Sequence, residues 1–290
     1  MRLRLDPDWL DAQYNNRARV PDHAQVLGRW AEASALARQG AAHAQLDVRY
    51  GDGDSETLDL FPAAQANAPV IVFIHGGYWR SLDKSDHSFV APALNAAGAH
   101  VVVPNYALCP AVSIEHITLQ MARALAWVWQ HAADWGGDRT RLGLVGHSAG
   151  GHLAAMLLCC RWRELAASGS ADMPAQPLAG ALAISGLYDL EPLRHTPMLQ
   201  ADLQLTAQAV ARLSPAFFAR PKSAKLYAVA GLDESDEFLR QTRLIRDVWG
   251  PTAVPVCETL PGVNHFTVLN GLADPQGRLH ELALRLVGLR

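Results

Sequence analysis

The chain has 290 residues, of which 50% are hydrophobic and 18% are charged, and its formal net charge is −3. This composition is too apolar and too nearly neutral for a disordered protein. The 25 Lys and Arg residues do not exceed the 28 Asp and Glu residues, so there is no basic surplus to neutralise phosphates and nucleic acid is not an expected partner. A globular fold is expected, and the length suits one large α/β domain over residues 1–290.

The apolar segments and the cysteines indicate where in the cell the protein is expected and whether it needs a metal or another cofactor. Residues 1–10 alternate apolar with charged side chains and lack the apolar core of a secretory signal. No charge-free apolar run approaches the ~18–20 residues that cross a bilayer, so no membrane partner is expected. The cysteines fit neither a disulfide framework nor a zinc site; they are Cys109, Cys159, Cys160 and Cys257. We expect structural, reduced thiols in a cytoplasmic protein that needs no metal or other cofactor.

The N-terminal part of the chain predicts helices followed by a hairpin. Residues 1–40 are expected to be helical and peripheral. Residues 46–50 and 57–61 flank the turn-rich sequence Gly51-Asp52-Gly53-Asp54, which predicts an antiparallel hairpin at an edge of the sheet.

From residue 70 onward, short apolar runs alternate with helix-length segments. Several runs are nearly continuous, which is typical of strands buried on both faces of a parallel sheet; they cover residues 70–74, 100–103, 141–145, 178–184, 225–230 and 254–260. Apolar residues at spacings of three and four predict helices over residues 115–131, 150–162, 234–249 and 275–289. This alternation predicts the α/β class, with a mostly parallel central sheet and helices on both faces.

Two stretches depart from the alternation, residues 163–177 and residues 191–221, and the second contains four prolines. They are candidate cap segments over the carboxyl edge of the sheet, where open α/β folds bind ligands.

The sharpest motif is the G-x-S-x-G sequence Gly146-His147-Ser148-Ala149-Gly150. It follows the predicted strand 141–145 and precedes a helical run, which is the placement that a nucleophile elbow requires. Small flanking residues allow the sharp turn that exposes the hydroxyl, so Ser148 is the candidate nucleophile. One alternative is an ordinary βα turn whose glycines permit close packing. Another is a phosphate loop, although no Gly-Lys-Ser/Thr sequence is present.

A second motif, His75-Gly76-Gly77-Tyr78-Trp79, follows the first predicted buried strand. Acyl transfer needs backbone N–H groups already aimed at the oxygen that gains charge, and two glycines after a strand permit such a bend, as in HGGG-type loops. Gly77 and Tyr78 are candidate donors of an oxyanion hole, with Ala149 as a third. His75 is expected to organise the loop by hydrogen bonding, which is compatible with a purely structural turn.

The position of a histidine along the chain selects the candidate base. Where the order is serine, acid, histidine, the base lies on a loop beyond the final strand. His265, in Pro261-Gly262-Val263-Asn264-His265-Phe266, has that position. His147 and His152 flank the elbow and His280 lies in the last predicted helix, so none of these three is favoured.

Three carboxylates are candidates for the acid that orients this base. Asp233 and Glu234 follow the predicted strand 225–230, and Asp189 follows the preceding strand. Acidic residues at the start of a helix also serve as caps, so position alone leaves the choice open.

Taken together, these motifs resemble the arylformamidase (kynurenine formamidase) branch of the α/β hydrolases, close to the hormone-sensitive-lipase-like esterases. The resemblance runs from about residue 14 to residue 268 and rests on YNNR at 14–17, HGGYW at 75–79, NYALCP at 105–110, GHSAGGHL at 146–153, SGLYDLEPL at 185–193, LSP at 213–215 and EFLRQ at 237–241. The family pattern carries its catalytic carboxylate three residues before the Glu of the last motif, which here is Glu234. Many members have Asp at that place, so Asp233 and Asp189 stay as alternatives.

The resemblance implies a serine hydrolase that cleaves an N-formyl aryl amide such as N-formylkynurenine through a formyl-enzyme. The alternatives are a carboxylesterase for short acyl or aryl esters and, more remotely, a non-catalytic ligand-binding protein on the same fold. Substrate-binding candidates are aromatic residues that could also be ordinary core residues; they are Tyr78, Trp79, Tyr106 and Phe266. The expected partner is a small-molecule substrate, and the sequence leaves open whether copies of the chain associate.

Overall fold

The computed structural model describes residues 4–167 and 173–290. Its centre is an eight-stranded sheet of order β1-β2-β4-β3-β5-β6-β7-β8. The β1–β2 and β2–β4 pairs are antiparallel and the other pairs are parallel. The strands are β1 (Gln45–Arg49), β2 (Thr57–Phe61), β3 (Ala68–Ile74), β4 (His100–Pro104), β5 (Gly137–His147), β6 (Leu178–Ile184), β7 (Lys225–Gly231) and β8 (Val256–Leu260).

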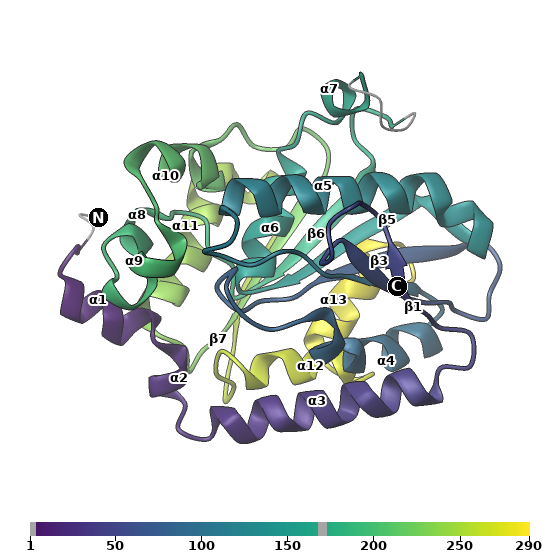
Figure 1. Cartoon of the computed structure of the whole chain (residues 1–290), viewed down its shortest axis with the longest axis horizontal. Coiled ribbons are helices and arrows are strands. Elements are labelled where there is room, and N and C mark those ends of the chain that lie inside the picture. Colours follow the sequence, from purple (N-terminus) through teal and green to yellow (C-terminus); the bar gives the residue numbers. More distant parts are fainter. Residues whose placement is uncertain (1–3, 168–172) are drawn as a thin grey trace.

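Helices cover both faces of this sheet (Figure 1). One face carries α3, α4, α12 and α13, and the other carries α5, α6 and α11. The helices are α1 (Pro7–Tyr14), α2 (Asn16–Arg19), α3 (His23–Gly40), α4 (Ala91–Ala96), α5 (Ile114–His131), α6 (Ala149–Leu158), α7 (Trp162–Ala167), α8 (Glu191–Arg194), α9 (Pro197–Leu203), α10 (Ala207–Leu213), α11 (Asp236–Ala253), α12 (Asn270–Ala273) and α13 (Arg278–Leu286). The mostly parallel α/β architecture is therefore confirmed.

Strand β3 shows why the central runs are continuously apolar. All seven of its residues are buried, because successive side chains point to opposite faces and both faces are covered. Val70, Val72 and Ile74 belong to the apolar cluster that also holds buried residues of α5, α6 and α11. Ile71 and Phe73 belong to the cluster on the other side, with residues of α3 and α13. The core is thus two apolar layers divided by the sheet.

The edge hairpin forms as predicted, and one predicted helix is divided. β1 is the outermost strand and pairs antiparallel with β2. The helix predicted over residues 150–162 instead ends at Leu158, and α7 begins at Trp162. The apolar pattern continues through Cys159 and Cys160, so periodicity does not mark the break.

Within residues 4–167 and 173–290, no helix combines the length and the apolar character needed to cross a membrane.

His152 on α6 is a buried histidine that joins two parts of the fold. Its side chain has no exposed surface, and its Nε2 donates to the carbonyl of Leu213, at the end of α10, over 2.7 Å. The ring also meets Trp79 edge to face, with centroids 4.9 Å apart. Burial lowers the pKa of His152 from 6.5 to about 4, so the folded protein holds this imidazole neutral.

This burial makes stability depend on pH. In the unfolded chain the imidazole takes up a proton below its ordinary pKa, whereas in the folded chain it does not until pH nears 4, so the folded state loses stability as pH falls through that window. Between pH 7 and pH 5, one such group costs about 2 kcal/mol of the free energy of unfolding. The variant His152→Gln keeps a donor for Leu213 but does not titrate. Urea unfolding at both pH values should show a loss about 2 kcal/mol smaller in the variant than in the wild type. Equal losses would contradict a neutral buried imidazole.

Candidate active site

Ser148 occupies the turn between β5 and α6, as predicted. Its backbone has φ 55° and ψ −116°, a strained conformation for a residue with a side chain. The turn closes because its neighbours lack side chains. A Cβ on Gly146 would lie 2.1 Å from the carbonyl oxygen of Gly150, and a Cβ on Gly150 would lie 2.0 Å from that of Ile74. Glycine at these two positions lets α6 start against β3 and leaves Ser148 at the carboxyl edge of the sheet.

His265 lies on the loop after β8 and meets Ser148 there. Its Nε2 is 3.0 Å from Ser148 Oγ, and its Nδ1 is 2.7 Å from Glu234 Oε2. The loop is held by Asn264, whose Oδ1 accepts from the N–H groups of Phe266 and of Thr267, each over 3.0 Å. His265 is buried, so these two contacts fix its ring between a hydroxyl and a carboxylate.

Of the three candidate acids, the structure brings Glu234 to His265. The other oxygen of Glu234, Oε1, accepts from the N–H of Gly231 over 2.7 Å and from Ser185 Oγ over 2.5 Å. The neighbouring Asp233 is exposed. Asp189 is buried but lies 3.8 Å from the Arg240 guanidinium.

Two residues that sequence reasoning did not assign to the site support this arrangement. Ser185 follows β6 directly, has φ 53° and is fully buried; its position after a central strand is the only sequence signal for its contact with Glu234. His147 donates from Nε2 to the carbonyl of His265 over 2.8 Å. Burial holds the pKa of His147 well below its ordinary value, with the nearby His265 as a further cause, so a neutral ring makes this contact.

The loop after β3 lies against Ser148. A Cβ on Gly76 would be 3.0 Å from that of Ser148, and one on Gly77 would be 2.0 Å from the carbonyl oxygen of Ser81. Gly77 has φ 110°, and Tyr78 and Trp79 also have positive φ, at 52° and 55°.

This bend leaves amides unused. Within the described parts of the chain, the N–H groups of Gly77, Tyr78 and Ala149 donate to no carbonyl or side chain. Three free donors beside a nucleophile candidate are what an oxyanion hole needs.

His75 holds this loop in place, in the organising role expected for it. Its Nδ1 is 2.8 Å from the carbonyl oxygen of Gly76, its Nε2 is 3.2 Å from Asn105 Oδ1, and its ring stacks on Tyr106 with centroids 4.2 Å apart. Tyr106 donates from its hydroxyl to the carbonyl of His75 over 2.8 Å. Burial lowers the pKa of His75, and it lies outside the pocket lining.

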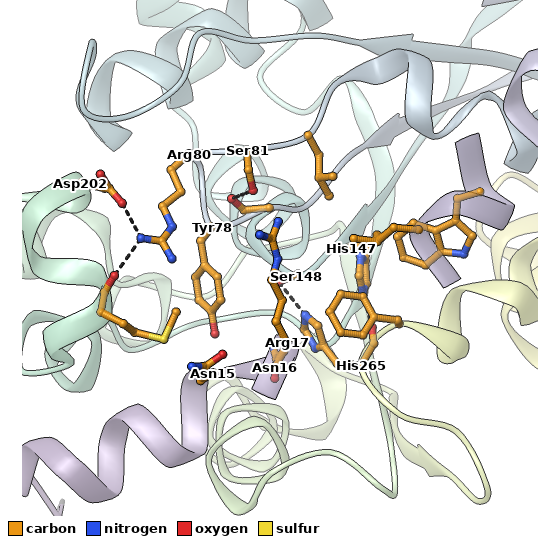
Figure 2. Close-up of a pocket in the computed structure, with 16 residues that line it drawn as sticks. Asn15, Asn16, Arg17, Tyr78, Arg80, Ser81, His147, Ser148, Asp202 and His265 are labelled. Atoms are coloured by element: carbon orange, nitrogen blue, oxygen red, sulfur yellow. Dashed lines mark hydrogen bonds and ion pairs between the residues drawn. The ribbon is translucent and has the colours of Figure 1, made fainter. Parts of the chain in front are cut away.

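A pocket opens in front of Ser148 and His265 (Figure 2). Of the four aromatic substrate-binding candidates, Tyr78 and Phe266 line it. Trp79 and Tyr106 do not, which corrects the prediction for both. Trp79 has no exposed surface and packs on His152, and Tyr106 lies beneath the loop with 1% of its surface exposed. The left-handed backbone at Tyr78 and Trp79 turns these adjacent side chains to different environments, which the sequence does not reveal.

The N-terminal segment is helical as predicted but is not peripheral. Asn15, Asn16 and Arg17 line the pocket. Tyr14 anchors them, because its buried hydroxyl donates to Glu237 Oε2 over 2.7 Å and its carbonyl accepts from the Tyr78 hydroxyl over 2.6 Å. The first helices therefore form one wall of the site.

The two cap candidates differ in position. In the stretch 191–221, Met198 and Asp202 of α9 line the pocket, and Arg80 from the loop after β3 contacts both of them, as an ion pair with Asp202 and over 2.8 Å to the carbonyl of Met198 (Figure 2). The stretch 163–177 follows α6, which runs back from the carboxyl edge, and its described residues do not line the pocket. Residues 168–172 lie outside the described chain. The expectation that 163–177 caps the carboxyl edge is thus wrong for the described part.

Neither metal ligands nor reactive thiols stand out. Across residues 4–167 and 173–290, no group of three or more His, Cys, Asp or Glu side chains is arranged to hold a metal ion. All four cysteines are free thiols, and burial raises the pKa of each.

Comparison with known proteins agrees with this geometry. The family described as BD-FAE matches residues 58–233, which is more than half of the chain. The kynurenine formamidase of Danio rerio is 30% identical over 98% of this chain and 97% of its own length. The carboxylesterase NlhH of Mycobacterium tuberculosis is 37% identical over 98 residues, or 33% of this chain and 30% of its own length. A crystal structure from Silicibacter sp. tm1040, provisionally named as a thioesterase, is 31% identical with a TM-score of 0.80, over 96% of this chain and 98% of that one.

The match of the Danio rerio enzyme is nearly complete in both directions, and the BD-FAE match spans the elbow and the loop after β3 and ends at residue 233. The chain is therefore an α/β hydrolase of the BD-FAE family, related to the kynurenine formamidases and the carboxylesterases.

Proposed function

We propose that this protein is a serine hydrolase that cleaves N-formyl aryl amides, N-formylkynurenine among them. The observation that carries the proposal is the line of hydrogen bonds from Ser148 Oγ through His265 to Glu234, at 3.0 and 2.7 Å, in a chain 30% identical to a kynurenine formamidase over nearly its whole length. The four free thiols suit a reducing cytosol as its location.

In the first half of the reaction, Ser148 Oγ attacks the formyl carbon while its proton passes to His265 Nε2. The carboxylate of Glu234 stabilises the imidazolium through Nδ1. The carbonyl oxygen becomes an anion and is held by the N–H groups of Gly77, Tyr78 and Ala149. As the intermediate collapses, His265 returns the proton to the aniline nitrogen, the C–N bond breaks and the amine leaves.

In the second half, water attacks the formyl ester on Ser148 while His265 takes up one of its protons. Collapse of this second intermediate breaks the ester bond, returns the proton to Ser148 Oγ and releases formate. The net reaction consumes one water and yields formate and an aryl amine.

A carboxylesterase for short esters is the second candidate. The same residues serve ester cleavage without change, and the local identity to NlhH supports it.

Paired assays separate these two activities. We expect the purified protein to release formate and kynurenine from N-formylkynurenine, with p-nitrophenyl acetate assayed in parallel. Efficient cleavage of the ester with no formate released would refute the formamidase proposal and leave the esterase.

Covalent labelling tests Ser148. A fluorophosphonate probe should label the wild type and leave Ser148→Ala unlabelled, and formate release should fall by about 10⁶-fold in that variant, as is typical when a nucleophile acting with its base is removed. A wild-type protein that takes up no probe would instead indicate a non-catalytic binding protein.

Adjacent carboxylates provide a matched test of the acid. Glu234→Gln should lower kcat about 10⁴-fold, because the amide cannot stabilise the imidazolium. Asp233→Asn makes the same chemical change one residue away, on an exposed side chain, and should leave kcat within about twofold. The reverse ranking, measured by formate release at pH 7.5, would assign the acid to Asp233.

A further inference from the structure

One cation in the pocket has no counter-charge. The charged side chains of Arg17, Arg80 and Asp202 line it, and Arg80 is paired with Asp202. Arg17 is exposed, and over the described parts of the chain its guanidinium takes part in none of the ion pairs and has no interaction with the other pocket residues drawn in Figure 2. Figure 2 shows this side chain extending across the pocket, in the same view as Ser148 and His265. The pocket therefore offers one unneutralised positive charge to a ligand.

The residue before it offers an unused donor. Asn16 lines the same pocket and is only 6% exposed, yet its Nδ2 has no hydrogen-bond partner in residues 4–167 and 173–290. A buried amide left unpaired is costly, and native structures rarely keep one without a reason. An acceptor atom on a bound molecule would satisfy it.

The backbone that carries these two residues is held in position, although the side chain of Arg17 itself is exposed. Asn15 caps α2 by accepting from the N–H of Ala18 over 3.1 Å, and Tyr14 is buried against Glu237 and Tyr78. The anchoring fixes where Asn16 and Arg17 meet the pocket. A guanidinium and an amide N–H that line one pocket suit an anion with two acceptor oxygens, which is a carboxylate.

We propose that Arg17 and Asn16 bind a carboxylate on the substrate, so that the enzyme selects substrates that carry a carboxylate. The identity of the bond that is cleaved in these substrates is taken from the proposed function. A formyl group has only hydrogen on its carbonyl carbon, so in a formamide the carboxylate must lie on the aryl amine that leaves. N-formylkynurenine meets this requirement.

The test compares substrates that differ only in this charge. One pair is N-formylkynurenine and its carboxamide. The other pair is the acetate ester of 3-(3-hydroxyphenyl)propanoic acid and that of its primary amide, in which the leaving phenol is the same. The wild type should prefer the carboxylate in each pair that it cleaves. Arg17→Ala should lower kcat/KM for the carboxylate about 10–100-fold, mainly through KM, and leave the carboxamide within about twofold. Arg17→Lys should restore part of the loss.

Two further variants complete the design. Arg19→Ala removes the same charge from the same helix, but Arg19 does not line the pocket. This variant should leave kcat/KM unchanged for both the carboxylate and the carboxamide substrate. Asn16→Asp keeps the shape of the side chain and replaces a donor with an acceptor. It should lower kcat/KM for the carboxylate substrate about tenfold or more relative to kcat/KM for the carboxamide.

The outcomes separate the two proposals. Equal loss on both members of a pair in Arg17→Ala would assign Arg17 a structural role and overturn the anion site. Cleavage of N-formylkynurenine with no preference over its carboxamide would overturn the anion site and keep the formamidase. A preference on the ester pair that Arg17→Ala abolishes, with neither formamide cleaved, would keep the anion site and overturn the formamidase.

Discussion

The contact on which the site depends is the backbone approach of α6 to β3 and β5. No side chain fits at Gly146 or Gly150, because a Cβ at either position would lie about 2 Å from a carbonyl group. This approach forces Ser148 into its left-handed conformation and sets it at the carboxyl edge of the sheet. It also brings the Gly76-Gly77 bend against the same serine. The hydroxyl and the free amides therefore share one cause, which is the missing side chains.

Both oxygens of the buried Glu234 carboxylate have hydrogen-bond partners. Glu234 is fully buried at its side chain, and a buried carboxylate is costly unless its oxygens are satisfied. Ser185 and the N–H of Gly231 satisfy one oxygen and His265 satisfies the other. These donors restrict the rotation of the carboxylate, which in turn fixes the ring of His265. In the reaction that we propose, such fixed dipoles need little rearrangement when charge develops on the imidazole.

Sequence patterns sufficed where one local constraint determines the structure. The apolar runs of β3 and β6 are best buried between two layers of helices, so the sheet was predictable. The glycines around Ser148 allow a close backbone approach that residues with side chains would block, so the elbow was predictable too. The choice between Asp233 and Glu234 was harder, because adjacent acids at a helix start look alike and only the turn after β7 decides which one faces inward. Tyr78 lines the pocket and Trp79 is buried because both residues have positive φ angles. Neither tyrosine nor tryptophan is a residue type that predicts a positive φ, so the sequence does not reveal this difference.

The N-terminal segment shows how tertiary contacts override local expectation. An amphipathic start to a chain is ordinarily a surface feature, yet Tyr14 is fully buried between the pocket loop and α11. Its partner Glu237 lies three residues after Glu234 and is also paired with Arg240. The wall that carries Arg17 is therefore joined to α11, the helix that follows Glu234. Losing the segment would remove the hydrogen bonds that Tyr14 makes with Glu237, Gln241 and Tyr78, although Glu237 would keep its pair with Arg240. The pocket wall that carries Arg17 and the helix that begins beside Glu234 are thus joined through the same buried side chain.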